Sequence, residues 1–97
     1  MNVVTAKLRV EQLQDGVFRV KVSEGAGESS HRVTLRTEYY QRIAGGKVEP
    51  AELVRRSFEF LLEHEPKESI LSTFDLTDIS RYFPNFEREI KRRLSGT

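Results

Sequence analysis

The sequence predicts an α+β fold, a three-stranded antiparallel meander with three or four helices packed on one face. In the first third of the chain, apolar residues recur at every second position, which is the period of a strand with one buried face. Beyond residue 37 they recur at spacings of three and four, which is the period of helices. The 97 residues suit one domain with a modest core, so we expect a single domain over residues 1–97.

The first two strands are predicted from alternating apolar residues on either side of the sequence QDG. These residues are Val4, Ala6, Leu8 and Val10, followed by Phe18, Val20 and Val22. A two-residue turn would place charged residues on the buried face. A three-residue loop over residues 14–16, with its glycine in the left-handed conformation of a bulge, instead sets Leu8 against Val22. We expect this second register, in which Arg9 lies opposite Lys21.

A third strand is expected over residues 31–37, after a loop rich in glycine and serine. Thr37 is expected to cap a short helix over residues 38–44, which Gly45-Gly46 then stops. A longer helix is expected from Pro50 to about His64, because proline is favoured in a first helical turn. One half of this helix is apolar, wide enough to lie flat on the sheet.

The C-terminal third is predicted to complete the helical layer. Residues 68–74 are compatible with either helix or extended chain. Asp75 and Asp78 are expected to form a capping box for a short helix that ends at Phe83, because the next residue is proline. In the last helix, the apolar stripe is expected to consist of Phe86, Ile90 and Leu94. The i,i+4 ion pairs expected outside this stripe are Glu87 with Lys91 and Glu89 with Arg93.

Most aromatic residues between positions 57 and 90 are expected to form the core. Phe60, at the edge of the apolar arc of its helix, and Tyr82 are the two expected to reach the surface. A contiguous exposed patch of Phe60, Phe74 and Tyr82 would indicate a surface for a partner.

The composition excludes several classes of protein. The formal net charge of +1 lacks the gross electrostatic signature of a non-specific nucleic-acid or membrane binder. The chain has no cysteine, so disulfides and thiolate sites are excluded. No stretch approaches the roughly 20 apolar residues needed to cross a bilayer, and the N-terminus lacks the apolar run of a signal peptide. We expect a cytoplasmic protein with no membrane partner.

The residue types and spacings that catalysis requires are missing. His31 and His64 lie far apart without the spacing of a zinc site, and we expect both as exposed residues at helix ends. The glycines at 45–46 are too few for a phosphate-binding loop. Asp75 and Asp78 are expected to cap a helix rather than to act as an acid–base pair. We therefore expect no enzyme, no catalytic residue, no metal site and no cofactor.

The predicted register concentrates cations on the outward face of the sheet. These are Lys7, Arg9, Arg19, Lys21, Arg32 and Arg36, with Glu11 as the one acidic residue among them. Setting these seven aside from 16 basic and 15 acidic residues leaves 10 and 14, so the remainder is net acidic.

Two interpretations of this face remain open. Clustered cations attract an anionic ligand, which predicts an acidic protein surface or nucleic acid as partner. Alternatively, the cations are solvated and only discourage edge-to-edge aggregation of the sheet. The face carries no aromatic residue, so stacking of bases on it is not expected.

Two resemblances add to this interpretation. The segments ELVRRSFEFLLEHEPKESIL, FDL and RYFPNFE resemble a group of short bacterial proteins without an assigned function. This resemblance covers residues 31 to 90 and implies no activity. The favoured prediction is therefore a small non-enzymatic binding or adaptor module, for which a homodimer would add buried area.

Residues 31–63, HRVTLRTEYYQRIAGGKVEPAELVRRSFEFLLE, resemble the strand, helix and longer helix of ribbon-helix-helix DNA-binding proteins. The resemblance implies a homodimer in which one strand from each chain pairs in the major groove. It assigns base reading to Arg32, Thr34 and Arg36, and the dimer core to Val33 and Leu35. Backbone amides near residues 48–51 would meet phosphate. A DNA-binding transcriptional regulator is thus the alternative prediction.

Overall fold

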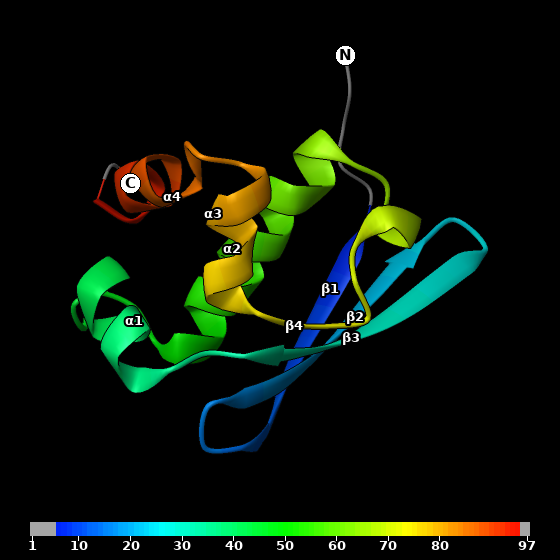
Figure 1. Ribbon diagram of the computed structural model, residues 1–97. Coiled ribbons are helices and arrows are strands. Elements are labelled where there is room, and N and C mark those ends of the chain that lie inside the picture. The colour runs from blue at the N-terminus through cyan, green and yellow to red at the C-terminus, as the bar shows by residue number, and fades with distance from the viewer. Residues whose placement is uncertain (1–5, 96–97) are drawn as a thin grey trace.

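The protein is a mixed four-stranded sheet covered on one face by helices (Figure 1). The computed structural model describes residues 6–95. The antiparallel meander is formed by β1 (Lys7–Gln14), β2 (Val17–Glu24) and β3 (Gly27–Thr34). A short strand β4 (Thr73–Asp75) then pairs parallel with β3. The α+β class and the meander are confirmed, and the sheet has one strand more than predicted.

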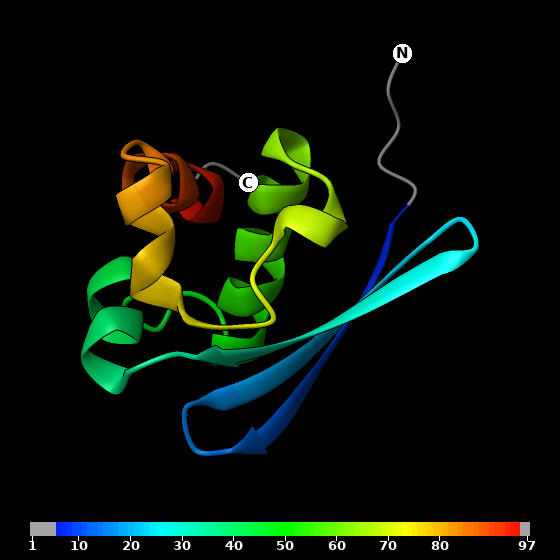
Figure 2. The same ribbon diagram turned by 45° about the vertical axis from the view of Figure 1, so that its right-hand side comes forward.

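The helices lie on one side of the sheet, where α2 packs on the strands and α4 packs on the other helices (Figure 2). They are α1 (Thr37–Ile43), α2 (Pro50–His64), α3 (Ile79–Tyr82) and α4 (Phe86–Ser95), with the 3-10 turns η1 (Lys67–Ser69) and η2 (Leu76–Asp78). The predicted bounds of α2 are confirmed. This helix packs over β1 and β2, and its polar edge reaches the sheet margin, where the Arg55 guanidinium donates to the Leu8 carbonyl at 3.2 Å.

The predicted register of the first hairpin is confirmed. Leu8 pairs with Val22 and Arg9 pairs with Lys21. Gly16 has the expected left-handed backbone, with φ of 71°. The prediction of a three-residue loop over residues 14–16 is wrong, because Gln14 pairs with Val17 and the turn consists of Asp15 and Gly16 alone. The extra residue that sets the register lies inside β1, as a bulge between Gln12 and Gln14. Val4, the first residue of the predicted alternation, lies outside the described residues.

The third strand begins and ends earlier than the predicted range of 31–37, because β3 is Gly27–Thr34. β3 starts at Gly27, and only Gly25-Ala26 form the turn that joins it to β2. The inward positions at the start of β3 are occupied by Ser29 and His31, opposite Val22 and Val20. Because these two residues are polar, they conceal the period of two that identified the other strands.

The prediction that His31 is exposed at a helix end is wrong. Its side chain lies on β3 and is only 3% exposed. Nδ1 lies 2.7 Å from the Leu71 carbonyl oxygen and Nε2 lies 2.8 Å from the Ser29 hydroxyl. Because a carbonyl oxygen only accepts hydrogen bonds, Nδ1 carries a proton. The burial of His31 is tolerated because both of its ring nitrogens have hydrogen-bond partners. His64, in contrast, is exposed at the end of α2, as predicted.

The undecided segment 68–74 contributes both a 3-10 turn and an extended strand. The Arg32 amide donates to the Ser72 carbonyl at 2.7 Å, and Phe74 pairs with Val33. Phe74 is buried, so a single inward aromatic side chain secures this three-residue strand. A strand this short cannot display a period, which is why the sequence left it ambiguous.

Helix capping follows the prediction at two of three positions. The Asp75–Asp78 capping box is confirmed. α1 ends at Ile43, and Gly45 follows with a left-handed φ of 55°. The prediction for Thr37 is wrong, because Thr37 is the first helical residue and the extended Arg36 precedes it without a side-chain cap.

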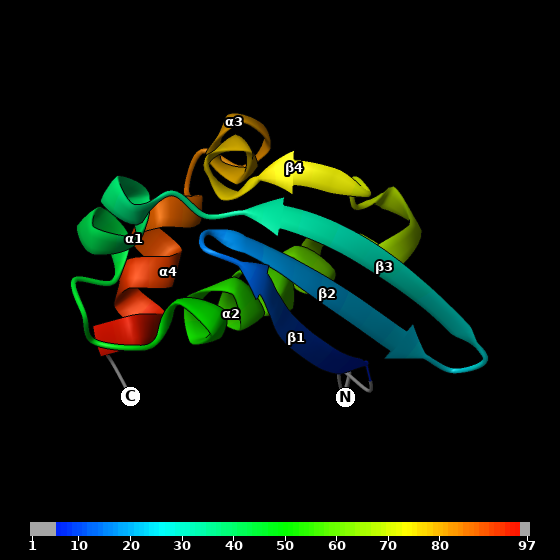
Figure 3. The same ribbon diagram turned by 90° about the horizontal axis from the view of Figure 1, so that it is seen from below.

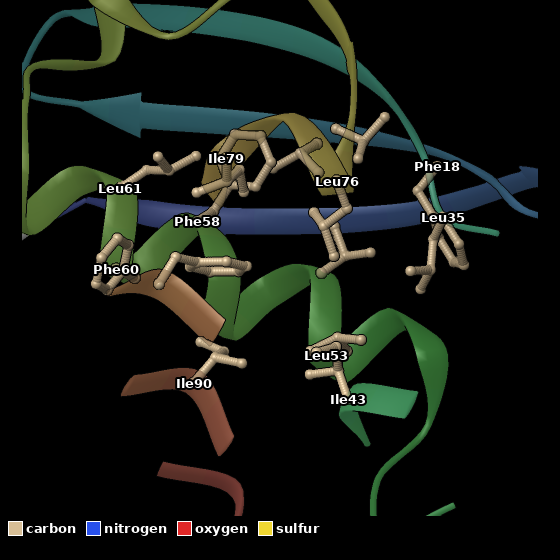
Figure 4. Close-up of a cluster of buried hydrophobic side chains, with 14 of the residues drawn as sticks. Phe18, Leu35, Ile43, Leu53, Phe58, Phe60, Leu61, Leu76, Ile79 and Ile90 are labelled. Atoms are coloured by element: carbon tan, nitrogen blue, oxygen red, sulfur yellow. The ribbon is translucent and has the colours of Figure 1, made fainter. Parts of the chain in front are cut away.

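The core lies between the sheet and the helices and continues between α2 and α4 (Figure 4). Phe58 and Phe60 are fully buried, so the expectation that Phe60 reaches the surface is wrong. Its ring packs edge-on against Phe86 and Phe83, at 5.2 and 5.7 Å between centroids. Tyr82 is exposed as predicted, but the patch of Phe60, Phe74 and Tyr82 does not form, because the first two are buried.

Candidate binding face on the sheet

The face of the sheet that turns away from the helices is open (Figure 3). The alternation of each strand sends its apolar residues into the core and its charged residues to this face. It carries Lys7 and Arg9 from β1, Arg19 and Lys21 from β2, and Arg32 and Thr34 from β3. Five of the six predicted cations therefore share one surface, and strand pairing places them in neighbouring rows.

Two like-charge pairs lie side by side at the centre of this face. Arg9 pairs across the strands with Lys21, and in the next row Arg19 pairs with Arg32. Directly opposed like charges destabilise an antiparallel pair by about 0.2–1 kcal/mol. Two adjacent repulsive pairs are an arrangement that folding alone does not favour.

Most of these cations are not neutralised within the described chain. Glu11 reaches Arg19 at 3.7 Å, and this exposed pair contributes little. Across residues 6–95, no carboxylate lies within 4 Å of the charged groups of the remaining four cations. We call the four cations Lys7, Arg9, Lys21 and Arg32 the free cations of the face.

Arg36 differs from the other predicted residues. β3 ends at Thr34, and Arg36 is the extended residue that precedes α1. Its guanidinium is paired with Asp75 at 3.1 Å. Its role is therefore to join the start of α1 to β4, and it is not a free cation.

The outward face also contains polar residues that the sequence prediction missed. The early start of β3 brings Glu28 opposite Ser23 and Ser30 opposite Lys21, and Thr73 adds to the row of Arg32. Ser23 donates to the Glu28 carboxylate at 3.1 Å. A hollow of about 390 Å³ lies among Arg9, Glu11, Arg19 and Lys21. A predicted third strand that began at Gly27 would have placed Glu28 and Ser30 on this face, opposite known positions of β2.

The strand that carries the residues assigned to base reading pairs within one chain, unlike the two-chain ribbon of the family. Arg32 and Thr34 are exposed on the open face, while Val33 and Leu35 are buried inside the single chain. Residues 32–34 pair with β2 on one edge and with β4 on the other. Because both edges of this segment are already paired, a strand from a second chain cannot pair with it.

Between residues 6 and 95, no three acidic, histidine or cysteine side chains are grouped as metal ligands. Over the same range, no helix combines the length and the apolar character required to cross a membrane.

Comparison of the chain with models of protein families, with curated proteins and with solved structures finds no match in any of the three.

Proposed function

We propose that this protein is a small, non-enzymatic binding or adaptor module that docks an acidic surface of a partner protein on the open face of its sheet. The observation that carries the proposal is the pair of adjacent like-charge contacts, Arg9 with Lys21 and Arg19 with Arg32. An anionic partner relieves this repulsion on binding, so its affinity gains from an interaction that the free protein lacks.

The composition of the face favours an acidic protein over nucleic acid. Glu11 and Glu28 lie among the cations, and each would repel a continuous line of phosphates. No aromatic side chain of the described strands faces outward to stack with bases. A protein surface can place a cation opposite each of these carboxylates and carboxylates opposite the free cations, which a line of phosphates cannot do.

The alternative is a DNA-binding regulator of the ribbon-helix-helix type. Its support is the exposure of Arg32 and Thr34 on the open face. The pairing of residues 32–34 on both edges counts against it, because the family's ribbon needs a strand edge free for the second chain.

The proposal is tested by affinity capture from native lysate with a variant that neutralises three free cations, Arg9→Gln, Lys21→Gln and Arg32→Gln. The matched control neutralises three exposed cations of the helical side, Lys47→Gln, Arg88→Gln and Lys91→Gln, none of which is ion-paired within residues 6–95. Both variants change the net charge equally, and thermal melting establishes that both remain folded.

We expect an acidic protein to be captured by the wild type and the control, with or without nuclease, and to be lost from the face variant. Capture of the same protein by the face variant would contradict the proposal. Recovery of nucleic acid, removed by nuclease and falling steeply with salt, would support the DNA-binding alternative instead.

A further inference from the structure

An apolar groove of about 280 Å³ lies between the end of α2, the segment from η1 to β4, and α3. Its floor consists of the inward side chains Leu61, Ile70, Phe74 and Ile79, which the helices and β4 bring together. Leu61 and Ile79 can be followed in Figure 4. The groove is on the helical side of the sheet and shares no residue with the cationic face.

The rim of the groove holds unusually exposed apolar side chains. Leu71 is 52% exposed and Tyr82 is 68% exposed, and across residues 6–95 these are the two large hydrophobic residues that are exposed. Both line this groove. Within the same range the Tyr82 hydroxyl makes no hydrogen bond. Single exposed apolar residues are ordinary, but their concentration around a concave apolar floor is typical of a binding surface.

The groove is already formed in the free protein. The carbonyl of Leu71 accepts a hydrogen bond from the buried His31 imidazole at 2.7 Å. Phe74 is held by the pairing of β4 with β3, and Ile79 follows directly after the capping box. Because buried groups fix the backbone on both sides of the groove, a ligand does not have to order this segment when it binds.

The polar residues around the groove are acidic. Glu65 and Asp78 line it, and no lysine, arginine or histidine does. Glu65 forms no ion pair with any residue between 6 and 95. Asp78 lies 3.7 Å from the exposed Arg81 and accepts a hydrogen bond from the Asp75 amide. An occupant that is complementary to this site combines an apolar side chain with a cation.

The outer edge of β4 offers a place for a peptide backbone. The Ser72 carbonyl accepts from the Arg32 amide on the side of β3, so strand alternation directs the N–H and C=O groups of Thr73 away from β3. Within residues 6–95, these two groups form no backbone hydrogen bond outside the sheet. Leu71 and Phe74 flank Thr73 and line the groove, so the groove lies beside this edge.

We propose that the groove binds a short segment of a partner protein in which a large aliphatic or aromatic residue lies next to lysine or arginine. The apolar side chain fills the groove and the cation pairs with Glu65, while the segment's backbone follows Thr73. The volume is below the roughly 300–1,000 Å³ of pockets for drug-sized ligands, which favours one or two anchoring side chains. The site is additional to the cationic face and does not depend on the function proposed for that face.

The test is selection of random twelve-residue peptides displayed on phage against the wild-type protein, followed by fluorescence polarisation with the enriched peptides. Enriched sequences are expected to share a large apolar residue beside a basic one. Leu71→Ser with Tyr82→Ser is expected to weaken their binding by about tenfold or more, since both side chains are exposed and their loss removes apolar contact area. Thermal melting checks that this double variant remains folded.

A second pair of variants tests the electrostatic part. Glu65→Lys is expected to weaken peptide binding by about three- to tenfold. Glu59→Lys is the matched control on the exposed side of α2 and is expected to leave binding unchanged. The variant of Arg9, Lys21 and Arg32 is also expected to bind the peptides normally, which separates this site from the cationic face.

Three outcomes would overturn the proposal. The first is that no peptide is enriched, and the second is that the enriched peptides bind the Leu71–Tyr82 double variant as tightly as the wild type. The third is that sedimentation equilibrium shows a dimer of the wild type that the double variant abolishes. In that case a second copy of this chain is the occupant of the groove.

Discussion

Gly16 is a residue whose identity is determined by its surroundings. Its φ is 71°, a conformation that residues with a side chain rarely adopt. A Cβ added there would lie 3.0 Å from the Leu35 carbonyl oxygen. The Leu35 amide in turn donates to the Gly16 carbonyl at 2.8 Å. The turn between β1 and β2 therefore also fixes the point at which the chain leaves β3.

Gly25 provides a matched comparison for a test of this role. It also has a positive φ, 59°, but nothing lies within 4 Å of an added Cβ. We expect Gly25→Ala to lose about 1 kcal/mol of unfolding free energy, which is the left-handed strain alone. Gly16→Ala is expected to lose about 2 kcal/mol or more, because the Leu35 backbone must also move. Equal losses in urea denaturation would show that the contact with Leu35 is unimportant.

At the scale of elements, α4 is held to two other helices by its charged residues. On one side, Glu87 accepts hydrogen bonds from the Arg42 guanidinium and the Tyr39 hydroxyl of α1, each at 3.0 Å. Arg42 lowers the pKa of Glu87, and burial with the bond to Glu87 raises the pKa of Tyr39. The predicted pair of Glu87 with Lys91 is thus replaced by a contact between helices.

On the other side, α4 is joined to α2 through Arg93. Its guanidinium contacts Glu63 at 2.7 Å and lies 5.6 Å from the centre of the Phe60 ring. Within α4 it also pairs with Glu89 at 2.9 Å, which confirms the predicted i,i+4 pair. Hydrogen bonds from Arg92 and Arg93 lower the pKa of Glu89 from 4.5 to about 2.

The lowered pKa of Glu89 predicts how stability depends on pH. A carboxyl group with a depressed folded pKa stabilises the fold above its ordinary pKa, and this contribution is lost as the pH falls through the folded value. We expect the loss between about pH 4.5 and about pH 2. Glu89→Gln should be less stable than the wild type at pH 7 and should approach it near pH 2, as measured by urea denaturation.

Glu59→Gln is the control for this prediction, because Glu59 is exposed on α2 and has no ion pair within residues 6–95. It should not change the pH dependence. In 1 M salt the difference between wild type and Glu89→Gln should shrink, since the pairs are accessible to solvent. A difference that is constant from pH 7 to pH 2 would rule out the assigned cause.

Elements whose apolar residues recur at a regular spacing were predictable from the sequence. Strands with polar inward residues, or with only a few residues, were not. The register of β1 with β2 and the bounds of α2 follow from apolar residues at regular spacing. The start of β3 was hidden because Ser29 and His31 occupy inward positions. The partner that makes His31 acceptable there, the Leu71 carbonyl, is 40 residues away in the chain.

The candidate site shows the same division. The cations of β1 and β2 could be placed on one face, because each hairpin position determines its neighbour. The contact between Arg36 and Asp75 could not be predicted, because it depends on the pairing of β4 with β3. The groove could not be predicted either, because it depends on how α2, β4 and α3 are placed relative to one another by tertiary packing.

At the scale of the whole molecule, the two candidate binding surfaces on opposite sides of the sheet differ in the sign of their charged residues. The open face carries the free cations, whereas the groove on the helical side is lined by Glu65 and Asp78. The like-charge pairs of the open face are unfavourable for the isolated protein. The binding that we propose for this face and the stability of the free protein are therefore opposed.

This opposition can be measured with Lys21→Gln, which removes the charge facing Arg9. We expect the variant to be more stable than the wild type by about 0.5 kcal/mol at low salt, and to bind the acidic partner more weakly. Lys47→Gln, at an exposed position outside the sheet, should change neither property. If Lys21→Gln is less stable at low salt, the repulsion between Lys21 and Arg9 is not significant.

The parallel strand β4 has a consequence for the order of folding. The meander pairs residues that are close in sequence, but Thr73–Asp75 must find Arg32–Thr34 across about 40 intervening residues. We expect this pairing to form after the local hairpins and helices, because closing a long loop costs more chain entropy. The groove beside β4 exists only when this last pairing is complete. A partner that recognises the groove would therefore bind the chain only after β4 has paired with β3.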